Sequence, residues 1–546
     1  MIKIVSKVVH KFAYISLYKK KSHLRRQGTK MSKFLKGTII LLVAGLITRM
    51  LGFLNRILIA RLIGEEGVGL YMMAYPTFSL VVTLTQVGLP VAISKRVAEA
   101  DAKGDSAKVK KILVVSLMTT LTLSLIFTPV LFFGAPILAK TVFTDARIIY
   151  PILAISPVIP IIAVSSVIAG YFQGKQNMKP SAYSLLIEQT VRIIFIMILT
   201  RIFLPYGIEY AASAVMIATV IGELISLLYL LTMFKIRKAF PLRKNFFKSL
   251  SKTKTIFKEL MSIGIPTTGS RMIGSVSWFL EPIVVTQALA IAGVSAVMAT
   301  KQYGALTGFA MPLLLLPSFV TVALSTSLVP AISEAHSLKQ YGTVEKRIQQ
   351  ALKFCVLTGA LPVIILLVLA GPLMEMLYNS LSGAYFIKLM APFILLQYLQ
   401  SPLQSALQAL DLARAAMINS LIGAVVKLLL IFTLASNPSF GINGVAIGIV
   451  VGFVLVTLLH YVTILKVIPL TFYVRYYAKI LATTILTGFA GKYLYAIFSE
   501  QLSLLYAIFA TVIVMCGIYL FFLLLLKVIN KGDIQKAISL IIPNRK

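Results

Sequence analysis

Long apolar stretches, separated by short polar segments, recur along almost the whole chain. Each stretch is about 20 residues long, which is the length that a helix needs to cross a hydrocarbon layer about 30 Å thick. None of them shows the alternation of apolar and polar residues that is typical of barrel strands. The pattern therefore predicts an all-α polytopic membrane protein with fourteen transmembrane helices. We centre these helices near Gly45, Val81, Leu123, Ile161, Ile194, Ile221, Ser277, Leu315, Ile364, Leu395, Leu429, Val451, Ile485 and Val512.

Composition and charge refine this picture. Of the 546 residues, 58% are hydrophobic and 13% are charged, whereas a soluble domain carries about 25% charged residues. The formal net charge of +36 would by itself also suit a nucleic-acid-binding protein. When the N-terminus is placed in the cytoplasm, however, most Lys and Arg residues fall in cytoplasmic segments, as the positive-inside rule describes. The sequence therefore predicts a cell-membrane protein with both termini in the cytoplasm and no nucleic-acid partner.

Basic segments divide the chain into predicted parts. From the N-terminus these are a cytoplasmic extension at 1–30, an N-terminal lobe of spans 1–6 at 31–234, a cytoplasmic linker at 235–258, a C-terminal lobe of spans 7–12 at 259–466, and spans 13 and 14 with a basic tail at 467–546. The extension and the linker each carry nine basic residues and no acidic one. The linker charge suits a topology signal and also contact with anionic lipid headgroups. Translation from Met31 is an alternative that would leave the extension out.

The two predicted lobes are related in sequence. The run Thr48-Arg49-Met50-Leu51-Gly52 inside span 1 returns as Ser270-Arg271-Met272-Ile273-Gly274 inside span 7. Three further matches, each displaced by 235 residues, pair Gln173 with Gln408, Lys179 with Arg414 and Arg192 with Lys427. Because each lobe has an even number of spans, the repeat is parallel, about an axis along the membrane normal. Two such lobes predict a transporter with its substrate site between them, near the midplane.

Arginines inside spans point to the chemistry of that site. An arginine at a helix centre costs roughly 2.5 to 3.5 kcal/mol on insertion scales, so it usually faces a protein-lined cavity. Arg49 and Arg56 are two turns apart on one face of span 1, and Arg271 opens span 7 with Ser275 and Trp278 on the same face. Planar guanidinium groups bind phosphate in a bidentate manner. The pattern therefore predicts a site for a pyrophosphate headgroup, although Arg56 could instead snorkel to the external surface.

Five further charged residues fall within spans. They are Glu188, Arg192, Glu223, Glu281 and Lys427. Glu188 and Arg192 are four residues apart and can neutralise each other on one helix face. An isolated carboxylate in a membrane can instead couple transport to a proton or another cation. The sequence leaves both roles, structural and coupling, open for these five residues.

No pattern of catalytic or metal-binding residues stands out in the sequence. It contains no phosphate-cradling GxxxxGK[ST] motif, no HExxH motif and no nucleophile elbow. Cys355 and Cys516 are far apart, and the four His residues do not have the spacing of metal ligands. We therefore expect no enzymatic activity, no cofactor and no metal site.

Four segments carry a family resemblance: FLKGT at 34–38, RMLGF at 49–53, ARLIGEEGVGLY at 60–71 and GLPVAIS at 88–94. They resemble the polysaccharide-transporter branch of the multidrug/oligosaccharidyl-lipid/polysaccharide exporter superfamily, which is related to the lipid II flippases. The resemblance covers residues 31–530. It implies two six-helix lobes followed by two C-terminal helices, and a flippase for the lipid-linked peptidoglycan precursor of the spore cortex.

The resemblance also assigns site residues. In the lipid II flippases, arginines on the first span and on the opening span of the second lobe line the cavity. Arg49 and Arg271 occupy the matching places here. The flippases have a second arginine six residues after the first, whereas this chain has Asn55 at that place and Arg56 next to it.

Three functions remain open from the sequence. The leading hypothesis is a flippase for an undecaprenyl-pyrophosphate-linked glycan that works by alternating access, with this lipid and anionic membrane lipids as its partners. A cation-coupled antiporter for drugs or small solutes is the second, and it would need a cavity dominated by acidic residues. The third is a non-transporting scaffold that recruits cell-wall synthases through its basic loops.

Overall fold

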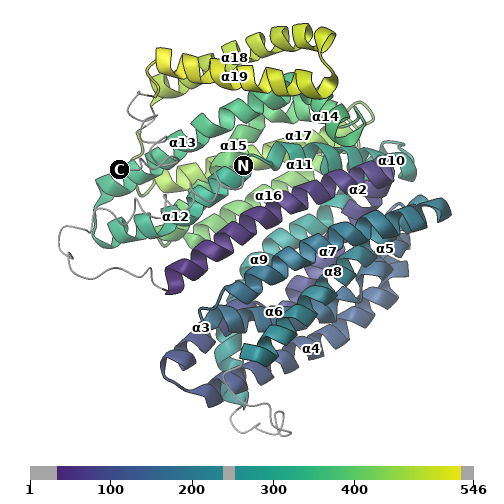
Figure 1. The fold of residues 1–546 in the computed structure, drawn as a ribbon, viewed down its shortest axis with the longest axis vertical. Helices are drawn as coiled ribbons and strands as arrows, with labels where there is room; N and C mark the ends of the chain where they lie inside the picture. Colours follow the sequence, from purple (N-terminus) through teal and green to yellow (C-terminus); the bar gives the residue numbers. More distant parts are fainter. Residues whose placement is uncertain (1–32, 238–252, 472, 530–546) are drawn as a thin grey trace.

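The computed structural model describes residues 33–237, 253–471 and 473–529, and within these ranges the chain is helical, without a β-strand (Figure 1). The predicted all-α fold is therefore confirmed. The extension at 1–30 and the C-terminal tail from 530 lie outside the described residues, as does most of the linker.

The helices form two lobes with an added pair. The N-lobe consists of α2 (Lys33–Gln86), α3 (Leu89–Ala102), α4 (Ser106–Ile137), α5 (Ile149–Ile155), α6 (Val158–Gly174), α7 (Lys179–Phe203) and α8 (Ile208–Arg237). The C-lobe consists of α9 (Thr253–Ile291), α10 (Ala296–Gly304), the π-helix η5 (Ala305–Ala310), α11 (Met311–Leu315), α12 (Ser318–Ser337), α13 (Tyr341–Val368), α14 (Ala370–Tyr378), α15 (Ala384–Ala409), α16 (Ala413–Ala435) and α17 (Ile442–Leu465). The added pair, α18 (Val474–Gln501) and α19 (Leu504–Leu525), lies at the outer edge of the C-lobe (Figure 1).

Twelve helices in the described part of the chain are long and apolar enough to cross a membrane. One of them, Ala44–Ala102, contains two predicted spans, because α2 bends at Gly64 without a loop. The backbone of Gly64 has φ 63° and ψ −170°, a conformation that glycine adopts without steric cost. The helix α15, which holds the predicted centre Leu395, is not among the twelve. The count of fourteen spans and the cytoplasmic position of the termini thus remain predictions.

The two lobes share an apolar core at one end of the bundle and have separate cores at the other. At the end that holds Gly64, called here the Gly64 end, buried residues of α2, α5 and α8 join those of α10, η5 and α15 in one cluster. At the opposite end, where Gly88 joins α2 to α3 and which we call the Gly88 end, one cluster lies in the N-lobe and another in the C-lobe. Burial of apolar surface therefore holds the lobes together chiefly at the Gly64 end.

The helix α9 links the lobes along the length of the bundle. Ile256 and Leu260 in its first turns belong to the core of the N-lobe, and its later part contacts α16 in the C-lobe. At the Gly88 end it also lies close to the start of α3, since a Cβ atom on Gly88 would be 2.5 Å from the carbonyl oxygen of Gly264. The helix α9 therefore contacts both lobes and can transmit a movement of one lobe to the other.

Candidate functional site

The first half of α2 presents two of the predicted arginines to its surroundings. The side chains of Arg49 and Arg56 are both exposed, whereas Asn55, between them, is buried with 6% of its surface exposed. Arg56 interacts electrostatically with Tyr71 of the N-lobe and with Tyr378 of the C-lobe. Arg56 therefore lies where the two lobes meet. An arginine at position 55 would instead point into the helix packing.

The predicted face of α9 is turned toward the second half of α2. The hydroxyl oxygen of Ser275 lies 3.1 Å from that of Thr83, and the ring of Trp278 lies 5.7 Å from that of Tyr75, centroid to centroid. Arg271 is one turn before Ser275 on the same face and is exposed. Since α2 belongs to the N-lobe, this face of α9 lies at the interface between the lobes.

Three of the predicted charges form a cluster inside the N-lobe. On α7, the guanidinium of Arg192 donates to the carboxylate of Glu188, one turn away, and its nitrogen lies 3.9 Å from an oxygen of Glu223 on α8. The helices can approach because position 222 is a glycine, where a Cβ atom would lie 3.0 Å from the carbonyl oxygen of Glu188. Arg192 also interacts electrostatically with Tyr75. The i,i+4 pair expected from the sequence is therefore formed, with a second carboxylate beside it.

The remaining two predicted charges pair with each other in the C-lobe. The ammonium nitrogen of Lys427 on α16 lies 2.6 Å from a carboxylate oxygen of Glu281 on α9, and both side chains are largely buried. Gly452 on α17 leaves room for the stem of Lys427, since a Cβ atom there would lie 3.0 Å from the Lys427 Cβ atom. The sequence matched Lys427 with Arg192, and each packs against a glycine of the following helix. The repeat thus extends to the packing of these two basic side chains, each against a glycine of the next helix.

The predicted residues therefore fall into two groups. All three predicted carboxylates lie near a basic side chain, Arg192 or Lys427. Arg49, Arg56 and Arg271 make no ion pair or hydrogen bond within the described part of the chain. Arg56 and the α9 face that carries Arg271 lie at the lobe interface. Arg49 lies on the exposed surface of α2, and no described contact joins it to Arg271.

Sequence reasoning missed the aromatic part of this region. Tyr71 and Tyr75 lie one turn apart on α2, with their ring centroids 5.5 Å apart. Their spacing of four residues places them on one helix face, which is the signal that could have found them. Together with Trp278 they form an aromatic surface beside Arg56 and Arg192.

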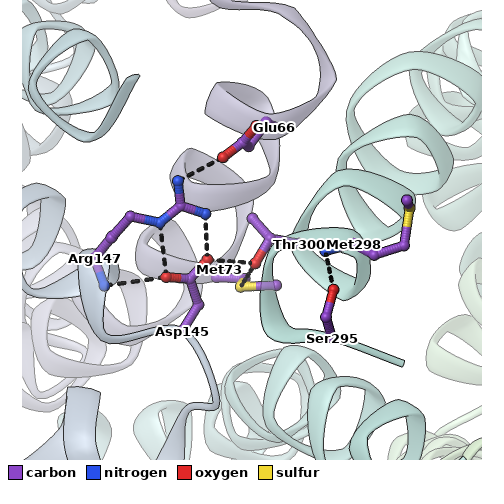
Figure 2. A network of polar contacts seen from close by, with 7 residues as sticks. All are labelled: Glu66, Met73, Asp145, Arg147, Ser295, Met298 and Thr300. Carbon is purple, nitrogen blue, oxygen red and sulfur yellow. Dashed lines mark hydrogen bonds and ion pairs between the residues drawn. The ribbon is translucent and has the colours of Figure 1, made fainter. Parts of the chain in front are cut away.

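A polar network at the Gly64 end also connects the lobes (Figure 2). The side chain of Arg147 in the N-lobe binds Glu66 on α2 and donates two hydrogen bonds to Asp145, and the backbone N–H of Arg147 donates a third. The hydroxyl of Thr300, in the middle of α10 in the C-lobe, donates to the second oxygen of Asp145 at 2.8 Å. Burial by itself raises the pKa of Asp145, but the hydrogen bonds from Arg147 and Thr300 outweigh it and leave the pKa below its usual value. We call these four residues the latch.

Two further polar contacts cross between the lobes beside the latch. Arg61 on α2 donates to the backbone carbonyl oxygen of Leu377 at 2.6 Å, at the C-terminal end of α14. Glu65 accepts hydrogen bonds from the hydroxyls of Ser380, at 2.6 Å, and Ser382. The sequence contained no signal that these residues, more than 300 positions apart, would meet.

Comparison with known proteins adds a family to this geometry. The profile of the family described as "Polysaccharide biosynthesis protein" matches residues 34–336. The chain is 56% identical over 503 residues to Stage V sporulation protein B of Bacillus subtilis (strain 168), covering 92% of this chain and 97% of that protein. It is 26% identical to Lipid II flippase MurJ of the same organism, covering 73% of this chain and 77% of that protein.

A solved structure shares the fold. The structure described as "Lipid II flippase MurJ, inward closed conformation" has a TM-score of 0.67 to this chain at 16% identity, covering 89% of this chain and 98% of that one. Together with the twelve apolar helices, these relationships make the protein a multi-pass protein of the cell membrane, and the predicted location is confirmed.

Proposed function

The chain belongs to the polysaccharide biosynthesis protein family, and on that premise we propose that it flips a lipid-linked glycan across the cell membrane. The substrate is an undecaprenyl-pyrophosphate glycan, specifically the peptidoglycan precursor for the spore cortex. One observation carries this proposal: in the described part of the chain Arg56 and Arg271 are unpaired at the lobe interface, while the predicted acidic residues within the lobes lie beside basic side chains. Such a surface attracts anions.

The proposed binding step uses guanidinium groups. Arg56 and Arg271 hold the pyrophosphate from opposite lobes, and Arg49 extends the basic surface along α2. The rings of Tyr75 and Trp278 offer an apolar floor for the sugar ring faces beside the charged groups. The polyprenyl tail stays in the lipid.

The proposed transport step is alternating access. In the predicted orientation, the Gly64 end faces the outside and the Gly88 end faces the cytoplasm. The shared apolar core and the latch then close the external side, while at the Gly88 end the lobes have separate cores and meet through the start of α9. Release on the outside requires the latch to break and the lobes to rock about the interface.

The pairing of the acidic residues distinguishes this proposal from a cation-coupled antiporter. An antiporter of that kind needs a carboxylate that is free to bind the coupling cation. Glu281 is held by Lys427, and Glu188 by Arg192. Glu223, with 16% of its side chain exposed and 3.9 Å from Arg192, is the remaining carboxylate for a coupling role.

We expect no enzymatic step in the cycle, and cell-wall synthases receive the flipped product.

Reconstituted flipping tests the proposal. Proteoliposomes containing fluorescent lipid II are prepared with the wild type and with the Arg56→Ala and Arg271→Ala variants. Arg414→Ala, at an exposed arginine on α16, is the matched control. We expect the wild type and the control to flip the lipid and both site variants to lose most of this activity. Equal flipping by all four proteins would exclude the arginine site, and an inactive wild type would exclude the substrate.

A further inference from the structure

A basic pocket lies away from the lobe interface, where α18 begins and α19 ends. Its volume is about 380 Å³, and it lies at the Gly88 end because it directly follows the end of α17. The lining residues are Tyr473, Val474, Arg475, Tyr476, Lys479, Lys527 and Val528. Three of the seven are basic and none is acidic. We call it the α18–α19 pocket.

Its walls are held in place by specific contacts. The ammonium group of Lys353 on α13 lies 3.3 Å from the centroid of the Tyr473 ring. The ammonium nitrogen of Lys479 donates to the carbonyl oxygen of Leu526 at 2.9 Å, which ties α18 to the end of α19. The loop before α18 is fixed to α13, since Glu345 accepts from the backbone and hydroxyl of Thr471 at 3.0 and 2.9 Å. The nearby carboxylate is therefore engaged in the loop and not in the pocket.

The chemistry of the pocket suits a phosphate group. Arg475, Lys479 and Lys527 are all exposed, and each retains donors that no described side chain takes up. The first turn of α18 adds backbone N–H groups, because its N-cap residue, Tyr473, makes no side-chain capping bond. The N-terminus of a helix of this length attracts anions through these N–H groups and the helix dipole. Three cations and a helix start thus converge on one small volume.

The surroundings favour a lipid over a soluble phosphate compound. Directly beyond the pocket, the outward faces of both helices are apolar and exposed, with Leu481 61%, Phe521 60% and Leu525 61% exposed. Acyl chains can lie along these faces while the phosphate occupies the pocket. The two tyrosine rings of the lining, Tyr473 and Tyr476, suit the boundary between headgroups and hydrocarbon.

We propose that the α18–α19 pocket binds the phosphodiester headgroup of an anionic phospholipid, of the phosphatidylglycerol type, at the Gly88 end of the helices. This site is separate from the glycan-lipid site and from the linker at 235–258. It ties α18 to α19 through a shared anion, at the point where the pair is anchored on the core of α13 by Ile480 and Leu523.

Native mass spectrometry of the purified full chain in detergent tests this site. The protein is titrated with phosphatidylglycerol and with phosphatidylcholine of the same acyl chains. The pocket variant carries Arg475→Gln, Lys479→Gln and Lys527→Gln. The matched control removes the same charge at three exposed positions elsewhere, as Lys95→Gln, Lys103→Gln and Arg414→Gln. We expect the pocket variant to bind phosphatidylglycerol roughly tenfold more weakly or worse, and the control to bind like the wild type.

Three results would overturn the proposal. Equal weakening in both variants would show a general effect of charge, and no weakening in either would show that the pocket is not the site. Binding of soluble glycerol 3-phosphate as tight as that of the lipid would replace the lipid by a free phosphate ester. Because Lys479 also supports the end of α19, the single variant Arg475→Gln is measured alongside. It keeps that contact, and we expect about a third of the triple variant's loss on a logarithmic scale.

Discussion

Replacement of Thr300 by valine should loosen the latch without changing the packing around it. Valine has nearly the shape of threonine but lacks the hydroxyl that donates to Asp145 at 2.8 Å. Thr300 is fully buried and Asp145 is 4% exposed, so water does not replace the lost donor. The variant therefore removes one charge-assisted hydrogen bond between the lobes and leaves Arg147 in place on the same carboxylate.

The size of the effect follows from the kind of bond. A hydrogen bond to a charged group contributes about 1.5 to 3 kcal/mol, and the lower value applies here because Arg147 still neutralises Asp145. A change of about 1.4 kcal/mol alters an equilibrium constant tenfold. We therefore expect the ratio of open to closed molecules at the Gly64 end to rise by about a factor of ten.

Pulsed electron spin resonance distances between the lobes measure this ratio. Spin labels are attached at Tyr206→Cys in the N-lobe and Leu381→Cys in the C-lobe, two exposed positions near the Gly64 end, in a Cys516→Ala background. The control is Thr307→Val, because the hydroxyl of Thr307 in η5 donates to the carbonyl oxygen of Tyr303, one turn earlier in the same lobe, and not across the interface between the lobes.

We expect a longer-distance population to grow in Thr300→Val and to stay at the wild-type level in the control. A distance distribution unchanged by Thr300→Val would refute the latch. Equal growth in the two valine variants would refute it as well, since the cause would then be local helix stability.

Three further predictions concern stability and pH. Lys427→Met leaves Glu281 buried and unpaired, which should lower the free energy of unfolding by about 3 to 5 kcal/mol. Thermal unfolding in detergent should show this loss of stability, and the double variant with Glu281→Gln should regain much of it. Gly222→Ala places a Cβ atom 3.0 Å from a carbonyl oxygen of α7, so we expect the free energy of unfolding to fall by about 1 to 3 kcal/mol. The control for the same unfolding measurement is Gly517→Ala, because the space around that glycine is open. The pKa of Asp145 lies below its usual value, so its contribution to closure is complete above about pH 4 and is lost as the pH falls through the lowered pKa; the interlobe distances should be the same at pH 8 and pH 5, and opening within that range would contradict this assignment.

Much of the fold could be read from local patterns. Apolar stretches of membrane-crossing length predict helices because a chain in hydrocarbon must satisfy its own backbone hydrogen bonds. The i,i+4 spacing of Glu188 and Arg192 likewise predicted their ion pair, which the structure contains. The repeat matched Arg192 with Lys427, and both were found against glycines of the next helix. Each of these features depends on residues close together in the chain or on the length of one segment.

Contacts between distant segments could not be predicted in this way. Nothing near Glu281 indicated that its partner would be Lys427, 146 residues away, and nothing near Asp145 indicated Thr300, 155 residues away. The difference between Asn55, which is buried, and Arg56, which faces the lobe interface, also depends on how α2 is rotated against its neighbours.

By itself, the sequence determined an all-helical membrane protein built from two related halves, and it identified the charged residues that lipid alone would not tolerate. Only the tertiary structure decided which of those charges neutralise one another and which stay free, and at which end the lobes share a core. The physical reason is that helix formation in a membrane is governed by the hydrophobicity and hydrogen bonding of each segment. Ion pairs between helices depend instead on approach distances of a few ångströms, which the packing of side chains and glycines from separate segments sets.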